Sequence, residues 1–175
     1  MSTDWTLTVT SDSPARTKHL AAALAPYCGV GDIVLLSGDL GVGKTAFAQG
    51  FAAGLGVVGP VTSPTFALVR QYRCGEDSPV STLIHADIYR TGSFDEVVDL
   101  ALAELVEDDA VAVIEWGDLA APAFGDNMLE IAISVDDTLG EGEPSRTLRA
   151  RGRGTWVARA EALGAAWSAS VTVPG

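Results

Sequence analysis

Positive charge is scarce in this sequence. Its 175 residues include 11 lysines and arginines against 23 aspartates and glutamates, a formal net charge of -12 at pH 7. A surface with this balance repels the phosphate backbone of a nucleic acid. Tight, direct binding of RNA or DNA is therefore not expected. Lys18 and Lys44 are the only lysines.

Cysteine and long apolar runs are scarce as well. Cys28 and Cys74 have no Cys-x-x-Cys spacing, and we expect them to be free thiols without a chemical role. No apolar run approaches the ~20 residues that span a bilayer, and the first residues lack the layout of a signal peptide. These absences predict a cytoplasmic protein without membrane contact. With 47% hydrophobic residues, residues 1–175 are expected to form one domain whose last few residues are a flexible tail.

Strand and helix patterns alternate along the chain. The apolar run 33–36, between Gly31 and Gly38, is typical of a central strand buried on both faces. Turn residues at 74–79 separate two extended stretches and predict an antiparallel hairpin. The pattern predicts an α/β fold with a single mixed β-sheet flanked by helices. The predicted strands cover 5–9, 33–36, 66–72, 80–85, 110–114, 128–135 and 146–150, and the predicted helices cover 14–27, 43–55, 93–106 and 155–167.

Residues 38–45 read Gly-Asp-Leu-Gly-Val-Gly-Lys-Thr, a full match to the phosphate-binding P-loop pattern G-x-x-x-x-G-K-[ST]. Such a loop needs glycine because its backbone amides wrap the phosphate so closely that a β-carbon would be in the way. Lys44 can reach the β and γ phosphates, and the Thr45 hydroxyl can bind magnesium. The motif predicts a P-loop NTPase fold that binds a nucleoside triphosphate with Mg²⁺. The predicted binding residues of the loop are Gly38, Asp39, Leu40, Gly41, Val42, Gly43, Lys44 and Thr45.

Two carboxylates follow predicted strands. Asp87 comes after the apolar pair 83–84, and Glu115 comes directly after 110–114. Magnesium and the attacking water need carboxylates near the ends of adjacent strands, so both residues are catalytic candidates. The alternative for each is a solvated turn residue or a helix cap. No guanine-reading Asn-Lys-x-Asp motif occurs, which favours ATP as the nucleotide.

The order of four motifs resembles the bacterial TsaE family. These motifs are GDLGVGKT at 38–45, SPTF at 63–66, HADIYR at 85–90 and IEW at 114–116. The motifs lie within residues 38–116, and the resemblance is taken to cover about two-thirds of the chain. The resemblance implies a small ATPase that supports formation of threonylcarbamoyladenosine in tRNA and acts beside the TsaB and TsaD proteins. Contact with tRNA would then be indirect, through that complex.

The resemblance also implies roles for individual residues. Lys44 and Thr45 contact phosphate and magnesium, and Glu115 becomes the acid on the metal. Asp87 becomes a further acid needed for hydrolysis, which makes Asp87, Glu115 and Lys44 the expected catalytic residues. Thr65 lies in a segment similar to a switch loop that senses the γ-phosphate. Trp116 is similar to a family tryptophan beside the nucleotide, with core packing as its alternative.

His85 and a group of four arginines fall outside this main site. His85 is interpreted as structural rather than as a general base, because it shares a strand face with Asp87. Arginines at 146, 149, 151 and 153 are interpreted as one basic edge of a strand. A solvated strand face is preferred for them over an adenine or tRNA contact.

Three functional classes remain open from the sequence. The leading one is an ATPase that drives or resets a tRNA-modifying protein complex. A small-molecule or protein kinase is the alternative, although no arginine-rich lid segment follows the third predicted helix. The third class is a regulatory nucleotide-binding module without turnover, in which Asp87 and Glu115 would be dispensable.

Overall fold

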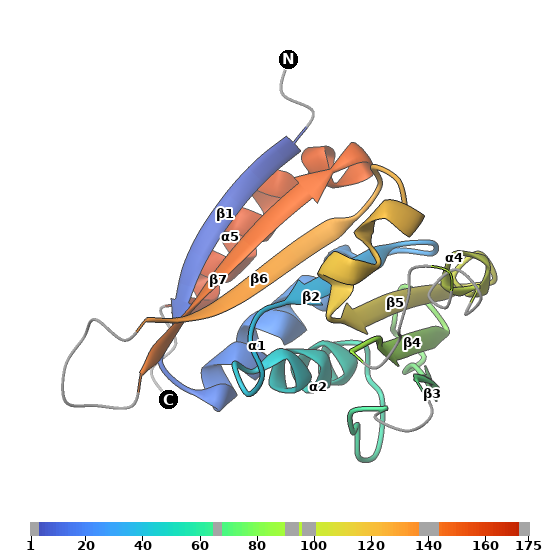
Figure 1. Ribbon diagram of the computed structural model, residues 1–175, viewed down its shortest axis with the longest axis horizontal. Helices are drawn as coiled ribbons and strands as arrows, with labels where there is room; N and C mark the ends of the chain where they lie inside the picture. Colours follow the sequence, from blue (N-terminus) through green and yellow to red (C-terminus); the bar gives the residue numbers. More distant parts are fainter. Residues whose placement is uncertain (1–3, 65–67, 90–94, 96–100, 137–143, 172–175) are drawn as a thin grey trace.

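The computed structural model describes residues 4–64, 68–89, 95, 101–136 and 144–171. Within these ranges, seven strands form a single sheet in the order β1-β7-β6-β2-β5-β4-β3 (Figure 1). The strands are β1 (Asp4–Ser11), β2 (Ile33–Ser37), β3 (Val69–Arg73), β4 (Thr82–Asp87), β5 (Ala110–Glu115), β6 (Leu129–Asp136) and β7 (Ser145–Arg153). The helices are α1 (Pro14–Leu24), α2 (Lys44–Gly54), α4 (Leu102–Leu105) and α5 (Ala160–Val171), with 3-10 turns η1 (Ala25–Tyr27), η2 (Gly117–Leu119), η3 (Ala121–Ala123) and η5 (Gly154–Arg159).

The sheet is mixed, as the sequence predicts. Strand β2 pairs in parallel with β5 and β6, and β4 pairs in parallel with β5. Strand β3 is antiparallel to β4, and β7 is antiparallel to β1 and β6. The predicted hairpin is thus present between β3 and β4. Because β2, β4 and β5 run in the same direction, the residues at their carboxyl ends meet at one edge of the sheet.

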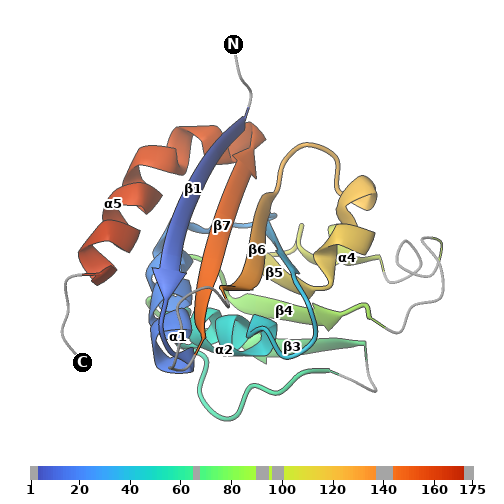
Figure 2. The ribbon, with the colours of Figure 1, turned by 60° about the vertical axis from the view of Figure 1, so that its left-hand side comes forward.

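Helices cover both faces of the sheet, and β2 shows why. Alternate side chains of a strand point to opposite faces. Val34 and Leu36 pack in the larger hydrophobic core, with α1, α2 and α5, whereas Ile33 and Leu35 pack in the smaller core, with α4. Figures 1 and 2 show these two helical layers with the twisted sheet between them. Among the described helices, none is long and apolar enough to cross a membrane.

Several predicted boundaries change. The predicted helix 155–167 begins as the 3-10 turn η5 and becomes α-helical only at Ala160. Its first turn is occupied by other contacts, because the Trp5 indole donates to the Trp156 carbonyl at 2.7 Å. Strand β7 also runs on to Arg153, beyond its predicted end at 150. The first residues of the predicted strand 66–72 and half of the predicted helix 93–106 lie outside the described residues.

Candidate nucleotide-binding site

The P-loop joins β2 to α2 at the carboxyl edge of the sheet. Gly38 has φ 136°, and a β-carbon there would lie 2.2 Å from the Ile133 carbonyl oxygen of β6. Gly43 has φ 117° and forms the N-cap of α2. Both backbones adopt a region that favours glycine. The two glycines at the ends of the motif are therefore required by the loop's own geometry.

The Lys44 side chain folds over the loop. Its ammonium donates to the carbonyls of Gly38 at 2.6 Å and Asp39 at 2.7 Å. It also lies 3.9 Å from the centroid of the Trp116 ring, a cation–π distance. Burial lowers the pKa of Lys44 below its usual value, while Glu115 and other nearby carboxylates oppose this shift. A buried cation is thus held where the loop carbonyls and the first turn of α2 converge.

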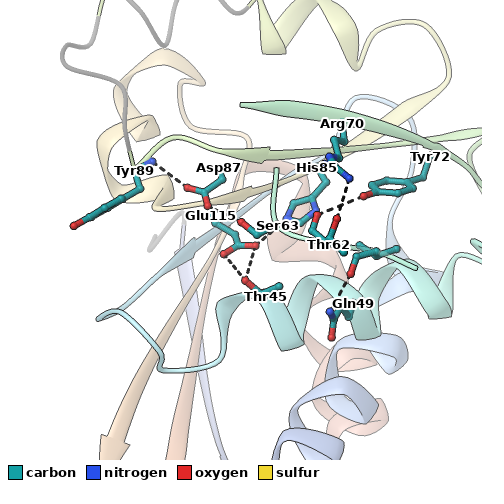
Figure 3. A network of polar contacts seen from close by, with 11 residues as sticks. Thr45, Gln49, Thr62, Ser63, Arg70, Tyr72, His85, Asp87, Tyr89 and Glu115 are labelled. Atoms are coloured by element: carbon teal, nitrogen blue, oxygen red, sulfur yellow. Dashed lines mark hydrogen bonds and ion pairs between the residues drawn. The ribbon is translucent and has the colours of Figure 1, made fainter. Parts of the chain in front are cut away.

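Thr45 and Glu115 form the centre of the polar network in Figure 3. The Thr45 hydroxyl lies 3.1 Å and 3.0 Å from the two carboxylate oxygens of Glu115 and donates to them. Glu115 is only 3% exposed, so its carboxylate needs such partners. Both groups are hard oxygen donors of the kind that Mg²⁺ prefers.

His85 contacts the same carboxylate, which the sequence interpretation missed. Its Nε2 lies 2.8 Å from the Glu115 Oε1 atom, and its ring is fully buried. A carboxylate only accepts hydrogen bonds, so Nε2 donates. His85 thus holds the Glu115 carboxylate in place, and its role as a structural residue rather than a general base stays a prediction. The sequence signal for this contact is a pair of buried strands, one ending in His-x-Asp and the other in Glu. If the two strands pair in parallel, the histidine comes near the glutamate.

Asp87 lies beside Glu115, because the two residues pair in register on β4 and β5. The Ser63 hydroxyl donates to its Oδ2 atom at 2.8 Å, and the Tyr89 backbone amide donates to its Oδ1 atom at 3.1 Å. Asp87 is half-buried, whereas Glu115 is buried. The structure therefore brings the two predicted acids together but gives them different environments.

The chain that leads into the predicted switch loop is held on three sides (Figure 3). Gln49 of α2 donates to the Val61 carbonyl at 2.9 Å. Arg70 of β3 donates to the Thr62 hydroxyl at 2.9 Å. Ser63 then reaches Asp87. The loop is thus anchored up to residue 64, and the predicted switch residue Thr65 lies outside the described residues.

Trp116 packs in the core and also lines the cleft, while its contact with a nucleotide stays a prediction. Its backbone has φ 61°, and its ring packs against the smaller hydrophobic core. The ring also stacks on Tyr89, with centroids 4.5 Å apart. The tryptophan is therefore fixed by core packing while one part of it faces the site.

These residues surround a cleft of about 590 Å³. Most of the predicted site residues line it, but Gly38 does not, Val42 is buried below the loop and Asp39 is exposed beside it. Ser63 and Tyr89 also line the cleft, although the sequence gave neither a site role. The cleft is lined by Leu40, Gly41, Gly43, Lys44, Thr45, Ser63, Asp87, Tyr89, Glu115 and Trp116.

The four arginines of β7 do not form one basic edge, which corrects the sequence interpretation. Side chains of a strand alternate between its two faces. Arg149, Arg151 and Arg153 therefore point to one face of β7, and Arg146 points to the other. Arg151 pairs with Asp4 at 2.6 Å, and Arg153 approaches Glu130 at 3.8 Å. Arg146 instead donates to the Val42 carbonyl of the P-loop at 3.1 Å.

A buried strand, a glycine-rich loop, a helix N-terminus and acids on neighbouring parallel strands together define a P-loop NTPase fold. Within that class, the family described as "Threonylcarbamoyl adenosine biosynthesis protein TsaE" matches residues 11–143. The chain belongs to the TsaE family. The resemblance drawn from the four sequence motifs and the predicted fold class are both confirmed.

Individual relatives agree with this assignment. The TsaE protein of Bacillus subtilis is 40% identical over 121 residues, which cover 69% of this chain and 73% of the relative. The TsaE protein of Streptomyces coelicolor is 41% identical over 127 residues, which cover 71% and 84%. The crystal structure of YdiB from B. subtilis superposes with a TM-score of 0.70 at 28% identity, covering 98% of this chain and 100% of that one.

Proposed function

We propose that the protein binds ATP with Mg²⁺ and hydrolyses it in support of tRNA threonylcarbamoyladenosine formation. The observation that carries the proposal is the meeting of Lys44, Thr45 and Glu115 in one cleft beside Asp87. These groups provide a cation for phosphate, oxygen donors for a metal, and a second acid. Each is what phosphoryl transfer requires.

Nucleotide binding rests on the loop and its lysine. The P-loop amides and the N-terminus of α2 present partial positive charge to the β and γ phosphates. Lys44 adds a full charge and exchanges its loop carbonyl partners for phosphate oxygens. Tyr89 is 54% exposed at the edge of the cleft, where it and Trp116 offer aromatic surface to the rest of the nucleotide.

The donor set around Thr45 fits a magnesium ion. Mg²⁺ is usually bound through one or two carboxylates together with substrate phosphates, rather than by an all-protein cage. Thr45 and Glu115 would hold it, and His85 would keep the Glu115 carboxylate oriented. When bound, the ion neutralises charge that develops on the phosphate oxygens.

Hydrolysis requires water to attack the γ-phosphorus and the bond to the β-phosphate bridging oxygen to break, which yields ADP and inorganic phosphate. Asp87 is the acid best placed to orient that water, because its half-buried carboxylate lines the cleft next to Glu115. Ser63 fixes one of its oxygens. Ser63 therefore connects the segment that leads to Thr65 with the hydrolytic acid.

The output of hydrolysis is proposed to be a change in a protein contact with TsaB and TsaD. The net charge of -12 disfavours tight tRNA binding by this chain alone. Thr65 would sense the γ-phosphate, so that ATP and ADP favour different assemblies. The tRNA is then reached through the complex.

The test is a hydrolysis assay of the purified chain, alone and with TsaB and TsaD of the same source. Complex mass and threonylcarbamoyladenosine are followed under ATP, ADP and no nucleotide. We expect ATP to strengthen association relative to ADP, and Thr65→Ala to narrow that difference while ATP still binds. Absence of association under every condition, with full modification when this chain is omitted, would refute the role in the complex. The ATPase proposal would survive that result.

A further inference from the structure

Arg146 is a cation that contacts the P-loop from the far side. It lies near the start of β7, where it pairs with Ser11 of β1 and Val135 of β6. Its side chain shares a strand face with Leu148 and Ala150, which pack in the larger core beneath α1 and α2. Arg146 is therefore directed toward the helical layer that carries the loop, and not toward the face of β7 on which Arg149 and Arg151 are exposed.

The contact itself is specific. The Arg146 Nε atom donates to the Val42 carbonyl at 3.1 Å, and one terminal nitrogen donates to the Pro144 carbonyl at 3.1 Å. The Nε atom would also lie 3.9 Å from a β-carbon placed on Gly43. Arg146 thus donates to backbone carbonyls, whereas Arg151 and Arg159 pair with carboxylates.

Peptide geometry gives this contact a consequence inside the loop. The Val42 carbonyl and the Gly43 N–H belong to one peptide unit, and no cis peptide bond occurs in the described residues. In a trans peptide the carbonyl and the N–H point in opposite directions. A hydrogen bond that holds the carbonyl toward β7 therefore directs the Gly43 N–H away from β7, toward the cleft that Gly43 lines.

This peptide needs an external restraint. Gly43 has φ 117°, and glycine tolerates so many backbone conformations that the unit could rotate at little cost. Lys44 already holds the carbonyls of Gly38 and Asp39. Arg146 holds the third carbonyl, that of Val42. A charged donor also polarises the peptide, which strengthens its N–H as a donor to phosphate.

We infer that Arg146 is a positioning residue of the nucleotide site, which sets the peptide between Val42 and Gly43 so that its N–H faces the phosphates. The inference rests on the proposed nucleotide binding. It extends that proposal to a strand beyond the family match, which ends at residue 143. Because the amide would contact both di- and triphosphate nucleotides, the residue should affect ATP and ADP alike.

The experiment compares Arg146→Met and Arg146→Lys with the matched control Arg149→Met. Arg149 lies on the same strand but is exposed on the opposite face. Calorimetry gives the Kd for ATP and ADP, and steady-state hydrolysis gives KM and kcat. We expect Arg146→Met to weaken both nucleotides by about three- to tenfold, with a rise in KM larger than any fall in kcat. Arg146→Lys should recover part of the loss, and Arg149→Met should bind like wild type.

A spectroscopic measurement separates positioning from general weakening. In ¹⁵N-labelled protein, ADP should shift the Gly43 amide resonance strongly downfield, and Arg146→Met should reduce that shift. The inference about Arg146 would be overturned if Arg146→Met kept the wild-type shift of the Gly43 amide, or if it bound nucleotides as tightly as Arg149→Met. The proposed nucleotide binding would survive either result. If Arg146→Met does not fold, Arg146→Lys decides on the same readouts. No nucleotide binding by the wild-type chain would instead overturn the proposed function on which the inference rests.

Discussion

The parallel strands β2, β4 and β5 differ in chemistry from the antiparallel ladder of β1, β7 and β6, in which β6 also pairs in parallel with β2 and so joins the two regions. In the parallel region the strand interiors are apolar except for the buried His85 of β4, and the other polar groups gather at the carboxyl ends, in the P-loop, at Asp87 and at Glu115. In the antiparallel region polar and apolar residues alternate along each strand. The difference follows from burial on both faces in one region and on one face in the other.

This difference places the expected catalytic groups in the parallel region and leaves a structural, supporting role to the antiparallel region. Parallel strands deliver their ends to a common edge, so a site can form there from residues distant in sequence. The antiparallel strands have no such edge, and their charged residues Arg151 and Arg153 pair with acids of neighbouring strands. Arg146 is one of the points at which the antiparallel region contacts the P-loop, and Ile133 of β6, packed against Gly38, is another. Changes in the parallel region should therefore affect turnover most.

The largest expected effect is the loss of hydrolysis on removing either acid of the parallel region. Glu115→Ala or Asp87→Ala should lower kcat by at least about 100-fold, because each acid acts on charge or water at the reacting phosphate. Part of the ATP affinity should remain, since backbone amides still hold the phosphates. Phosphate-release assays and calorimetry measure the two quantities separately. Wild-type turnover by either variant would remove that residue from the mechanism.

The second largest effect is expected on ATP affinity when Lys44 is replaced. Lys44→Ala should weaken ATP by at least about tenfold, because a charge-assisted hydrogen bond to phosphate is lost. The fold should persist, and circular dichroism checks this. Removing the buried ammonium also removes a desolvated charge, so the melting temperature should not fall sharply. Unchanged affinity in a folded variant would refute the P-loop assignment and with it the contrast between the regions.

Much of the parallel region could be predicted from sequence. The strand 33–36, the loop at 38–45 and the acid Glu115 all follow from local patterns, since buried runs and glycine spacing are short-range signals. The pairing of Asp87 with Glu115 in register follows once both strands are placed in parallel. These elements also lie within the family match at 11–143.

What could not be predicted depends on contacts between distant residues. His85 and Glu115 meet across two strands, and nothing local marks the histidine as a partner of the acid. The sequence alone groups Arg146 with Arg149, Arg151 and Arg153 because they are near one another in the chain, although Arg146 points to the opposite face of the strand. Its contact with Val42 spans 104 residues and depends on the order of strands in the sheet. The start of α5 was also missed, because Trp156 is positioned by packing and not by helix propensity.

The four tryptophans offer a way to observe the two regions separately. Trp156 and Trp167 are fully buried in the larger core, and Trp5 packs against it. Trp116 packs against the smaller core on the other side of the sheet, and its ring lies near Lys44. Among the four, Trp116 is the one that lines the cleft. Nucleotide binding should therefore be reported by this tryptophan.

The smallest expected effect follows from this arrangement. Adding ATP should move Lys44 away from the Trp116 ring and toward phosphate, which changes the surroundings of the indole and so its fluorescence. Trp116→Phe should abolish most of that change while weakening ATP by only about two- to fivefold, because phenylalanine keeps the stack on Tyr89 but makes a weaker cation–π contact. Trp5→Phe is the control, since Trp5 lies in β1 at the opposite side of the sheet, and it should keep the signal. If Trp116→Phe keeps the fluorescence change and Trp5→Phe loses it, the antiparallel region responds to nucleotide, and the assignment of chemistry to one region and support to the other is wrong.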